Sequence, residues 1–282
     1  MSNEIHIDAL LPAEMARRAE LLGVRKAEMK LLSMLALAVL AGAFIGLGAA
    51  FATTITAGTS GEWPYGVTRL LTGLVFCLGL ILVIVGGAEL FTGNNLIVMA
   101  WASKKVTTSA VLRNWIIVYL GNFIGSLGTA LVIFLGKQYT FGGGAVGTTV
   151  LTIANSKVHL DFIQAIALGI MCNAMVCLAV WMSYSARSVT DKILAIIFPI
   201  SGFVAVGFEH SVANMYFIPI GLFIKQFDPA FVAKTGLDVG ELTWGTFLVN
   251  NLLPVTIGNI IGGAGLVAIV YWFIFLRESP AK

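Results

Sequence analysis

The chain has 282 residues, of which 58% are hydrophobic and only 11% are charged, and its formal net charge is +3. Soluble domains carry roughly 25% charged residues, so this composition excludes a globular protein with a fully hydrated surface. It predicts an integral membrane protein whose outer surface faces lipid.

The N-terminal segment, residues 1–30, carries too many charges for the apolar core of a signal peptide. We expect an amphipathic cytoplasmic helix there, with Asp8 as a candidate N-cap. Its apolar residues recur near heptad spacing at Leu11, Met15, Leu22 and Met29. Two interpretations fit this pattern: a helix lying on the membrane headgroups, or a lid over the membrane domain.

Six apolar stretches follow, each long enough for a membrane-spanning helix. They cover residues 31–57, 70–100, 114–136, 162–186, 193–224 and 246–276. They define a six-helix membrane domain at 31–276 and a short cytoplasmic tail at 277–282. If both termini are cytoplasmic, twelve of the 17 Lys and Arg residues lie inside and five outside, which satisfies the positive-inside bias.

Two of these spans are too long for one helix. The 34 residues around Glu89 and the 32 residues around Glu209 carry no other charge. Continuous helices of these lengths would run for roughly 50 Å, whereas the hydrocarbon core is about 30 Å thick. We therefore expect the second and fifth helices to be broken near their middles.

The two breaks carry matching motifs, which indicates an internal repeat. GAELFTGN at 87–94 and GFEHSVAN at 207–214 share G-x-E-x-x-x-x-N, and the following spans carry GNFIG at 121–125 and GNIIG at 258–262. Each half then holds three spans, at about 31–136 and 162–276. Because three is odd, the second half is inverted in the membrane relative to the first, as in many transporters.

The polar residues at the breaks are candidate functional residues. His210 is the only histidine at membrane depth, and an ionisable residue there is a functional candidate by default. Its unperturbed pKa of about 6.5 allows proton exchange at physiological pH. Two adjacent side chains cannot both point into one pore, so we expect Glu209, and its counterpart Glu89, to accept hydrogen bonds from backbone N–H groups freed at the breaks. Asn94 and Asn214 would satisfy the same broken ladders.

Several segments resemble the formate/nitrite transporter family. They are GFEHSVANM at 207–215, GAELFTGN, VCLAVWMSYSARS and VTIGNIIGG, and the resemblance covers nearly the whole chain. The N-terminal LLPAEMARRAELLGV and C-terminal YWFIFLRE are similar to the formate-channel branch. The resemblance implies a homopentamer in a bacterial inner membrane, in which each protomer holds its own pore within an aquaporin-like arrangement of six helices.

The resemblance also implies site residues. His210 would be the pore histidine, with Asn173 and Thr92 near it, and Lys157 would lie in the outer vestibule. Asn173 falls in the middle of the fourth span, where it would either form a cross-helix hydrogen bond or face His210; the sequence leaves both open. The resemblance places narrow apolar constrictions at Phe76, Leu80, Leu90, Phe91, Val176 and Phe203.

These residues indicate how a weak acid could cross. Moving an isolated carboxylate into an apolar medium costs tens of kcal/mol in the idealised limit, whereas protonating an acid with a pKa of about 4 at pH 7 costs ~4 kcal/mol. We therefore expect passive, pH-dependent transport of formate and related small anions, with proton exchange at His210. The alternative is a proton-coupled secondary transporter of a monocarboxylate or nitrite.

Other classes of function have weaker support. The chain lacks the Asn-Pro-Ala motifs of an aquaporin, and GTSG around Ser60 is too short a match to indicate a serine protease. We expect no catalytic site, no metal site because no Cys or His cluster is present, no cofactor and no nucleic-acid partner.

Overall fold

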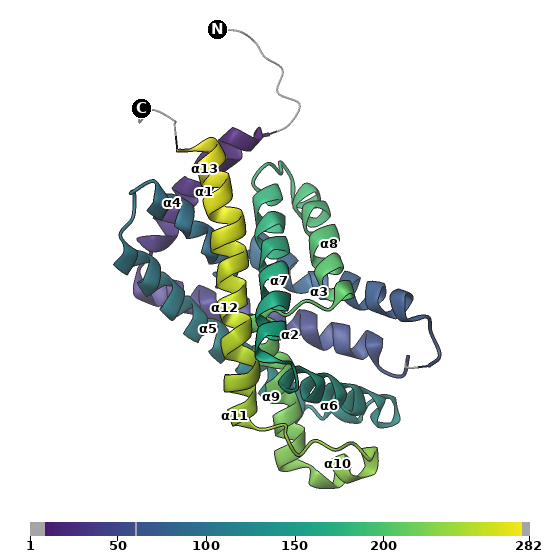
Figure 1. Ribbon diagram of the computed structural model, residues 1–282. Helices are drawn as coiled ribbons and strands as arrows, with labels where there is room; N and C mark the ends of the chain where they lie inside the picture. The colour runs from purple at the N-terminus through teal and green to yellow at the C-terminus, as the bar shows by residue number, and fades with distance from the viewer. Residues whose placement is uncertain (1–8, 60, 278–282) are drawn as a thin grey trace.

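The computed structural model describes residues 9–59 and 61–277 and is all-helical over that part of the chain (Figure 1). Asp8, Ser60 and the predicted tail beyond Arg277 lie outside the described residues. The elements of the first half are α1 (Pro12–Ala27), α2 (Leu31–Thr56), α3 (Tyr65–Gly86), the 3₁₀ turn η1 (Gly93–Ile97), α4 (Val98–Ala102) and α5 (Thr108–Leu135). Two 3₁₀ turns follow, η2 (Gln138–Thr140) and η3 (Gly142–Gly144).

The elements of the second half are α6 (Ala145–Val158), α7 (Phe162–Ser183), α8 (Val189–Val206), α9 (Ser211–Phe227) and the short α10 (Pro229–Thr235). The last span is one long helix that contains two π-helical segments. It consists of α11 (Trp244–Thr246), η4 (Phe247–Leu252), α12 (Leu253–Ile260), η5 (Ile261–Ile269) and α13 (Val270–Phe275).

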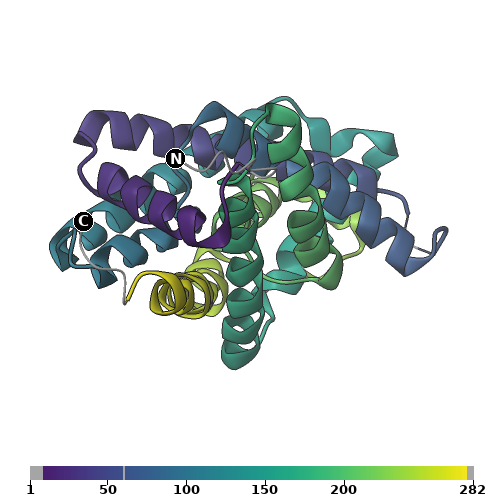
Figure 2. The ribbon, with the colours of Figure 1, turned by 90° about the horizontal axis from the view of Figure 1, so that it is seen from above.

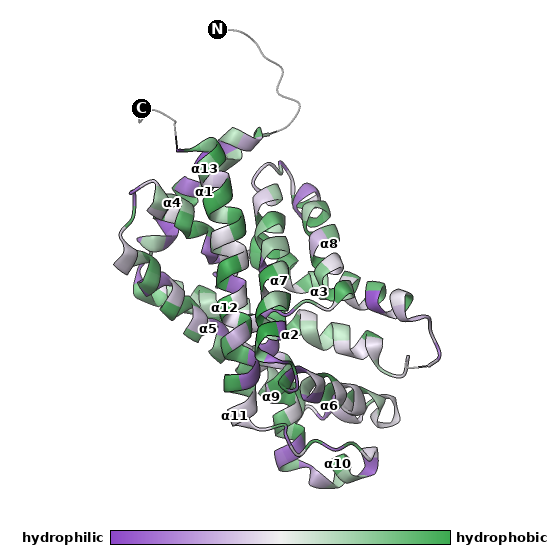
Figure 3. Ribbon diagram, in the orientation of Figure 1, coloured by the Kyte–Doolittle hydropathy of each residue, from purple (hydrophilic) through white to green (hydrophobic). Residues whose placement is uncertain are grey.

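Six helices are long and apolar enough to cross a membrane, which confirms the predicted number of spans. They are α2, α3, α5, α7, α8 and the helix from Trp244 to Phe275. Their residues are mostly hydrophobic along their lengths, whereas hydrophilic residues gather at α1, α10 and the connections (Figure 3). The third span begins earlier than predicted, at Thr108, because the Thr107 side chain accepts a hydrogen bond from the Ala110 N–H and caps the helix there.

Both predicted breaks are present, and both have the same geometry. α3 ends at Gly87 and α8 ends at Gly207, with φ angles of 74° and 89°. At each break, the N–H of the residue that follows the glycine donates to a carbonyl in the last turn of the preceding helix. Ala88 N–H donates to the Val83 carbonyl, and Phe208 N–H donates to the Phe203 carbonyl. Such helix ends place a residue in the left-handed conformation, which glycine adopts without steric cost, so glycine is strongly favoured at both positions.

The matching glycine motifs mark close helix contacts. A Cβ built on Gly125 of α5 would lie 1.9 Å from the Val39 carbonyl oxygen of α2. A Cβ on Gly262 of the last span would lie 2.0 Å from the Ile170 carbonyl oxygen of α7. The first and third spans of each half therefore pack backbone to backbone, the contact that small residues allow in membrane helices.

α1 lies at one end of the molecule together with α4 and α13, and α6 lies with α10 and α11 at the other (Figure 1). Seen from above, α1 lies between α2 and the C-terminal helix (Figure 2). Its face carrying Met15, Ala16, Ala19, Gly23 and Ala27 is buried. α1 therefore packs on protein along this face, and its position relative to the membrane headgroups stays a prediction.

We expect Gly125→Ala to lower the stability of the protein, because the added methyl group would meet the Val39 backbone, which cannot move aside cheaply. Overpacking of this kind costs about 1–3 kcal/mol. Gly128→Ala on the same helix is the matched control, since a Cβ there meets nothing within 4 Å and alanine favours the helix. The midpoint of thermal unfolding of the purified protein in detergent measures both, and equal midpoints would contradict the packing argument.

Candidate functional site

Two cavities enter the protein from its opposite ends. The α1 cavity, of about 250 Å³, is bounded by α1, α3 and the first break, and its wall includes Lys26, Leu80 and Leu90. The α6 cavity, of about 260 Å³, is bounded by α3, α6 and the second break, and its wall includes Lys157 and His210. The two cavities share no lining residue.

Apolar side chains separate the two cavities. Phe76 and Phe203 line the α6 cavity, while Leu80, one helical turn after Phe76 on α3, lines the α1 cavity with Leu90. All four are at most 3% exposed. The rings of Phe76 and Phe203 meet edge to face, with centroids 5.8 Å apart. The barrier between the cavities is therefore apolar, and these four of the six predicted constriction residues lie at it.

The other two predicted constriction residues lie elsewhere. Phe91 lines neither cavity, and its ring packs edge-on against Trp115 and Tyr119, with centroid distances of 6.0 and 4.9 Å. Val176 of α7 is buried in the main hydrophobic core and also lines neither cavity. In this conformation neither side chain reaches a cavity wall, and a role for them in the constriction stays a prediction.

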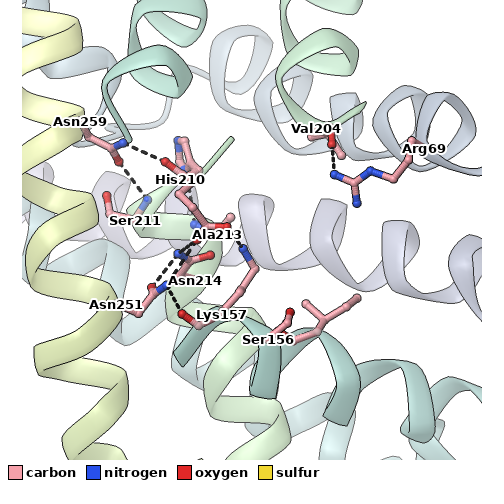
Figure 4. A network of polar contacts seen from close by, with 12 residues as sticks. Arg69, Ser156, Lys157, Val204, His210, Ser211, Ala213, Asn214, Asn251 and Asn259 are labelled. Carbon is pink, nitrogen blue, oxygen red and sulfur yellow. Dashed lines mark hydrogen bonds and ion pairs between the residues drawn. The ribbon is translucent and has the colours of Figure 1, made fainter. Parts of the chain in front are cut away.

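A buried ion pair flanks the second break. Lys157 Nζ on α6 lies 2.6 Å from Glu209 Oε1, and the Lys157 and Glu209 side chains are only 15% and 7% exposed. Asn214 Nδ2 donates to Glu209 Oε2 at 2.7 Å and to Asn251 Oδ1 at 2.7 Å. Asn251 Nδ2 in turn donates to the Lys157 carbonyl at 2.9 Å, which closes the network (Figure 4).

The first break has the same network, built on α1. Lys26 Nζ lies 2.5 Å from Glu89 Oε1, and Asn94 Nδ2 donates to Glu89 Oε2 at 2.7 Å. Asn94 Nδ2 also donates to Asn114 Oδ1, and Asn114 Nδ2 donates to the Lys26 carbonyl. The correspondence makes α1 the counterpart of α6, so each repeat begins one helix earlier than the predicted bounds of 31 and 162.

These contacts correct the expected donors for the two glutamates. Glu89 and Glu209 accept from lysine and asparagine side chains, not from freed backbone N–H groups. A buried carboxylate retains its charge most favourably beside a cation. The sequence alone does not show which lysine pairs with which glutamate. The expectation that the Asn94 and Asn214 side chains satisfy the broken ladders is wrong for the same reason, since both bond to carboxylates and to other asparagines.

The broken backbone is satisfied instead by the asparagines of the two GN-x-IG motifs. Asn122 Oδ1 accepts from the Phe91 N–H at 2.9 Å, and its Nδ2 donates to the Ala38 and Glu89 carbonyls. The Asn122 side-chain amide therefore joins the first break to α2, the first span of the same half.

Asn259 repeats this pattern in the second half. Its Oδ1 accepts from the Ser211 N–H at 2.9 Å, and its Nδ2 donates to the Gly169 and Glu209 carbonyls (Figure 4). Sequence reasoning used the two motifs as markers of the repeat but missed these roles, although an asparagine at the same place in both copies was the available signal.

His210 forms the N-cap of α9. Its Nδ1 lies 3.0 Å from the Ala213 nitrogen, and because an amide N–H can only donate, Nδ1 is the acceptor. The ring proton is therefore assigned to Nε2, which lies 3.0 Å from Thr92 Oγ1. The imidazole is 3% exposed and nearly parallel to the ring of Phe203, with centroids 6.0 Å apart. The predicted proximity of Thr92 to His210 is present.

Asn173 forms a cross-helix hydrogen bond, one of its two predicted roles. Its Nδ2 donates to the carbonyls of Thr92 and Asn259, at 3.2 and 2.7 Å. It lines neither cavity. Asn173 therefore links α7 to the first break and to the last span.

Further cations that sequence reasoning did not select lie on the cavity walls. Arg69 lines the α6 cavity, and its guanidinium donates to the Val204 and Ala205 carbonyls at the end of α8. Such a cation neutralises the partial negative charge of a helix C-terminus. Arg18 and Lys192 line the α1 cavity with Lys26. No group of three or more His, Cys, Asp or Glu residues that could hold a metal occurs within residues 9–59 and 61–277.

Comparison with known proteins agrees with this arrangement. The family model for formate/nitrite transporters matches residues 13–273. The formate channel FocA of Escherichia coli K12 is 48% identical over 96% of both chains, and FocA of Haemophilus influenzae is 45% identical over 91% of both. A solved structure, a pentameric formate channel with formate bound, is 46% identical and superposes with a TM-score of 0.82 over 88% of this chain and 98% of its own.

The chain therefore belongs to the formate/nitrite transporter family and is a multi-pass membrane protein. The expected all-α fold of six membrane helices, with the second and fifth broken, is confirmed. The family is one of transporters, which confirms the prediction that the chain is not an enzyme.

We expect Asn259→Leu to lower the free energy of unfolding by about 2–4 kcal/mol, because it leaves the Gly169 and Glu209 carbonyls and the Ser211 N–H without their partner in a buried site. Asn122→Leu should have a similar effect in the other half. Asn155→Leu is the control, since the Asn155 amide makes one bond, to the Asp238 carbonyl. Chemical denaturation in detergent measures the three variants, and a loss at Asn259 no larger than at Asn155 would refute the bridging role.

Proposed function

We propose that this protein is a passive formate channel in which each protomer conducts through the two cavities described above. The observation that carries the proposal is the pair of cavities that approach each other from opposite ends and are separated by buried apolar side chains. Such a barrier excludes ions but admits a small neutral acid. The relatives named above, and the solved channel with formate bound, support formate as the substrate.

The cavity walls favour an approaching anion. The α6 cavity carries Lys157 and Arg69, against the single carboxylate of Glu209. The α1 cavity carries Arg18, Lys26 and Lys192, and Glu89 lies beside Lys26. Each cavity thus has an excess of positive charge close to the barrier, which raises the local concentration of a small monovalent anion.

Formate crosses the barrier as the neutral acid, with His210 as the group that exchanges the proton. In the neutral imidazole, Nδ1 accepts the Ala213 N–H and Nε2–H points to Thr92. At physiological pH, only the doubly protonated imidazolium can give a proton to formate. Both ring nitrogens carry hydrogen in the imidazolium, so Nδ1 can no longer accept the Ala213 N–H and that hydrogen bond must first break. Proton exchange is therefore coupled to a rotation of the imidazole away from the α9 cap.

The constriction consists of Phe76 and Phe203 on the α6 side and Leu80 and Leu90 on the α1 side. Phe91 and Val176 act as a second layer that holds these side chains in place. Thr92 positions the imidazole, and Asn173 fixes the Thr92 carbonyl.

We further propose a homopentamer in a bacterial inner membrane, with both termini and the α1 cavity on the cytoplasmic side. The excess of Lys and Arg in the segments on that side supports the orientation. The pentamer of the solved relative supports the assembly.

Replacing His210 by asparagine separates its two roles. His210→Asn keeps an N-cap acceptor for the Ala213 N–H but cannot titrate, so we expect an assembled protein whose formate flux no longer rises at acidic pH, with uptake at pH 5 falling about tenfold or more. His210→Phe loses the cap as well, and its stability should fall by about 1 kcal/mol. Stopped-flow flux of formate, nitrite and chloride in liposomes, at several pH values, measures the first effect.

Native pH dependence of formate uptake in His210→Asn would contradict the proton role. The same vesicles distinguish a channel, in which formate returns its proton to His210 as it leaves, from symport, in which the proton leaves with it. With equal formate on both sides, an imposed pH gradient drives net formate movement only in the second case, and an unaltered formate distribution would contradict coupling.

Arg69→Gln tests anion attraction, because it removes the positive charge by which the α6 cavity exceeds its one carboxylate and leaves the Lys157–Glu209 pair intact. We expect the apparent KM for formate entering from the α6 side to rise about three- to tenfold, while the maximal rate changes less. Lys192→Gln is the matched control, since Lys192 lines the α1 cavity and its effect should appear for entry from that side. If neither variant changes KM, these cations do not attract the anion.

A further inference from the structure

A third cavity, of about 690 Å³, lies at the end of the molecule that carries α1 and α4, apart from the two transport cavities. Its wall is formed by the end of α4, the connection 103–107, the start of α5 and the last turns of the C-terminal helix. None of its lining residues lines a transport cavity. The formate pathway therefore does not account for it.

The side chains of Trp101 and Trp272 line this cavity, and the indole N–H of each donates a hydrogen bond. Trp101 Nε1 donates to Thr108 Oγ1 at 3.0 Å, and Trp272 Nε1 donates to Ser103 Oγ at 3.0 Å. Trp101 is nevertheless 43% exposed. Tryptophan gathers at the boundary between hydrocarbon and headgroups, so the cavity lies at the depth of the lipid headgroups.

The cavity also carries an uncompensated positive charge. Lys105 is paired with Glu20 of α1, at 2.5 Å, although 54% of the Lys105 side chain remains exposed. Lys104 is exposed, and its ammonium group has no hydrogen-bond or ion-pair partner within residues 9–59 and 61–277, although its backbone N–H donates to the Trp101 carbonyl. No acidic residue lines this cavity. Its charge therefore complements an anion.

Two apolar stripes lead from the cavity toward the middle of the membrane. On α5, one turn after Thr108, exposed residues recur every fourth position at Leu112, Ile116 and Leu120. On the C-terminal helix the exposed residues Leu266 and Ile261 continue from Ile269. Both stripes lie on membrane spans and carry no charge.

The two helices meet below the cavity. The Tyr119 hydroxyl of α5 lies 2.8 Å from Thr256 Oγ1 of α12, and the helices separate from there toward the cavity (Figure 1). Tyr119 lies 11 residues after Thr108 on the same helix, which is roughly 16 Å at a rise of 1.5 Å per residue. This is about half of a 30 Å hydrocarbon core, which is the depth of one leaflet.

We infer that this cavity binds the headgroup of an anionic glycerophospholipid, with an acyl chain lying along the two stripes. Lys104 and Lys105 contact the phosphate, Trp101 and Trp272 pack beside the glycerol backbone, and the chain ends near Tyr119. A free phosphate would match the lysines but would leave the stripes without a role. A second copy of this chain would cover the apolar stripes but would leave the exposed charge of Lys104 without a binding partner.

Brominated lipids quench tryptophan fluorescence on contact and therefore test the site in the assembled protein. In vesicles with equal mole fractions, we expect dibrominated phosphatidylglycerol to quench more than dibrominated phosphatidylcholine. The Trp101→Phe/Trp272→Phe variant should lose most of this excess. Lys104→Gln should reduce the preference for phosphatidylglycerol by about three- to fivefold, whereas Lys104→Arg should retain it.

Lys234→Gln, an exposed lysine on α10 at the other end of the molecule, is the control and should leave the preference unchanged. Formate flux in the same vesicles confirms that each variant is folded. Equal quenching by the two lipids in the native protein, or an undiminished preference in Lys104→Gln, would overturn the inference. So would protection of Trp101 from both lipids, because another protein surface would then cover the cavity.

Discussion

The structure depends on two asparagine side chains that satisfy a broken backbone at membrane depth. Backbone N–H and C=O groups in the hydrocarbon region have no water to bond, so a helix can stop there only if other protein groups replace the lost bonds. Asn122 and Asn259 each supply one acceptor and two donors in the two halves. Without them, the chain could not turn at Gly87 or Gly207 inside the membrane, and the two cavities could not approach each other.

The same construction in both halves makes their differences informative. His210 occupies the place of Leu90, counted from the glutamate of each motif. The histidine caps α9, which resumes at once as a regular helix, whereas the first half continues after Leu90 through a 3₁₀ turn into the short α4. Corresponding positions of the two repeats therefore carry one titratable and one apolar side chain, and both are buried. A histidine in place of Leu90 would put a second polar group among buried apolar side chains.

The sequence predicted those features that depend on local composition. The breaks followed from apolar runs that carry a single charge each and are too long for the bilayer, and the repeat followed from two pairs of short motifs in the same order. The partners of the buried glutamates could not be predicted, because Lys26 and Lys157 reach them from helices far away along the chain. The position of Phe91 away from both cavity walls could not be predicted either, since the direction of a side chain in a non-helical turn depends on contacts such as those with Trp115 and Tyr119.

The role of α1 also follows from the repeat. Its counterpart α6 lies between the third and fourth spans, and α1 precedes the first. Side-chain contacts join α1 to the membrane spans, and they include the pair between Lys26 and Glu89. Removing one partner from such a buried pair costs about 3–5 kcal/mol. If α1 moved away, Glu89 would remain buried without a cation beside the barrier, so α1 belongs to the membrane domain in the same sense as α6.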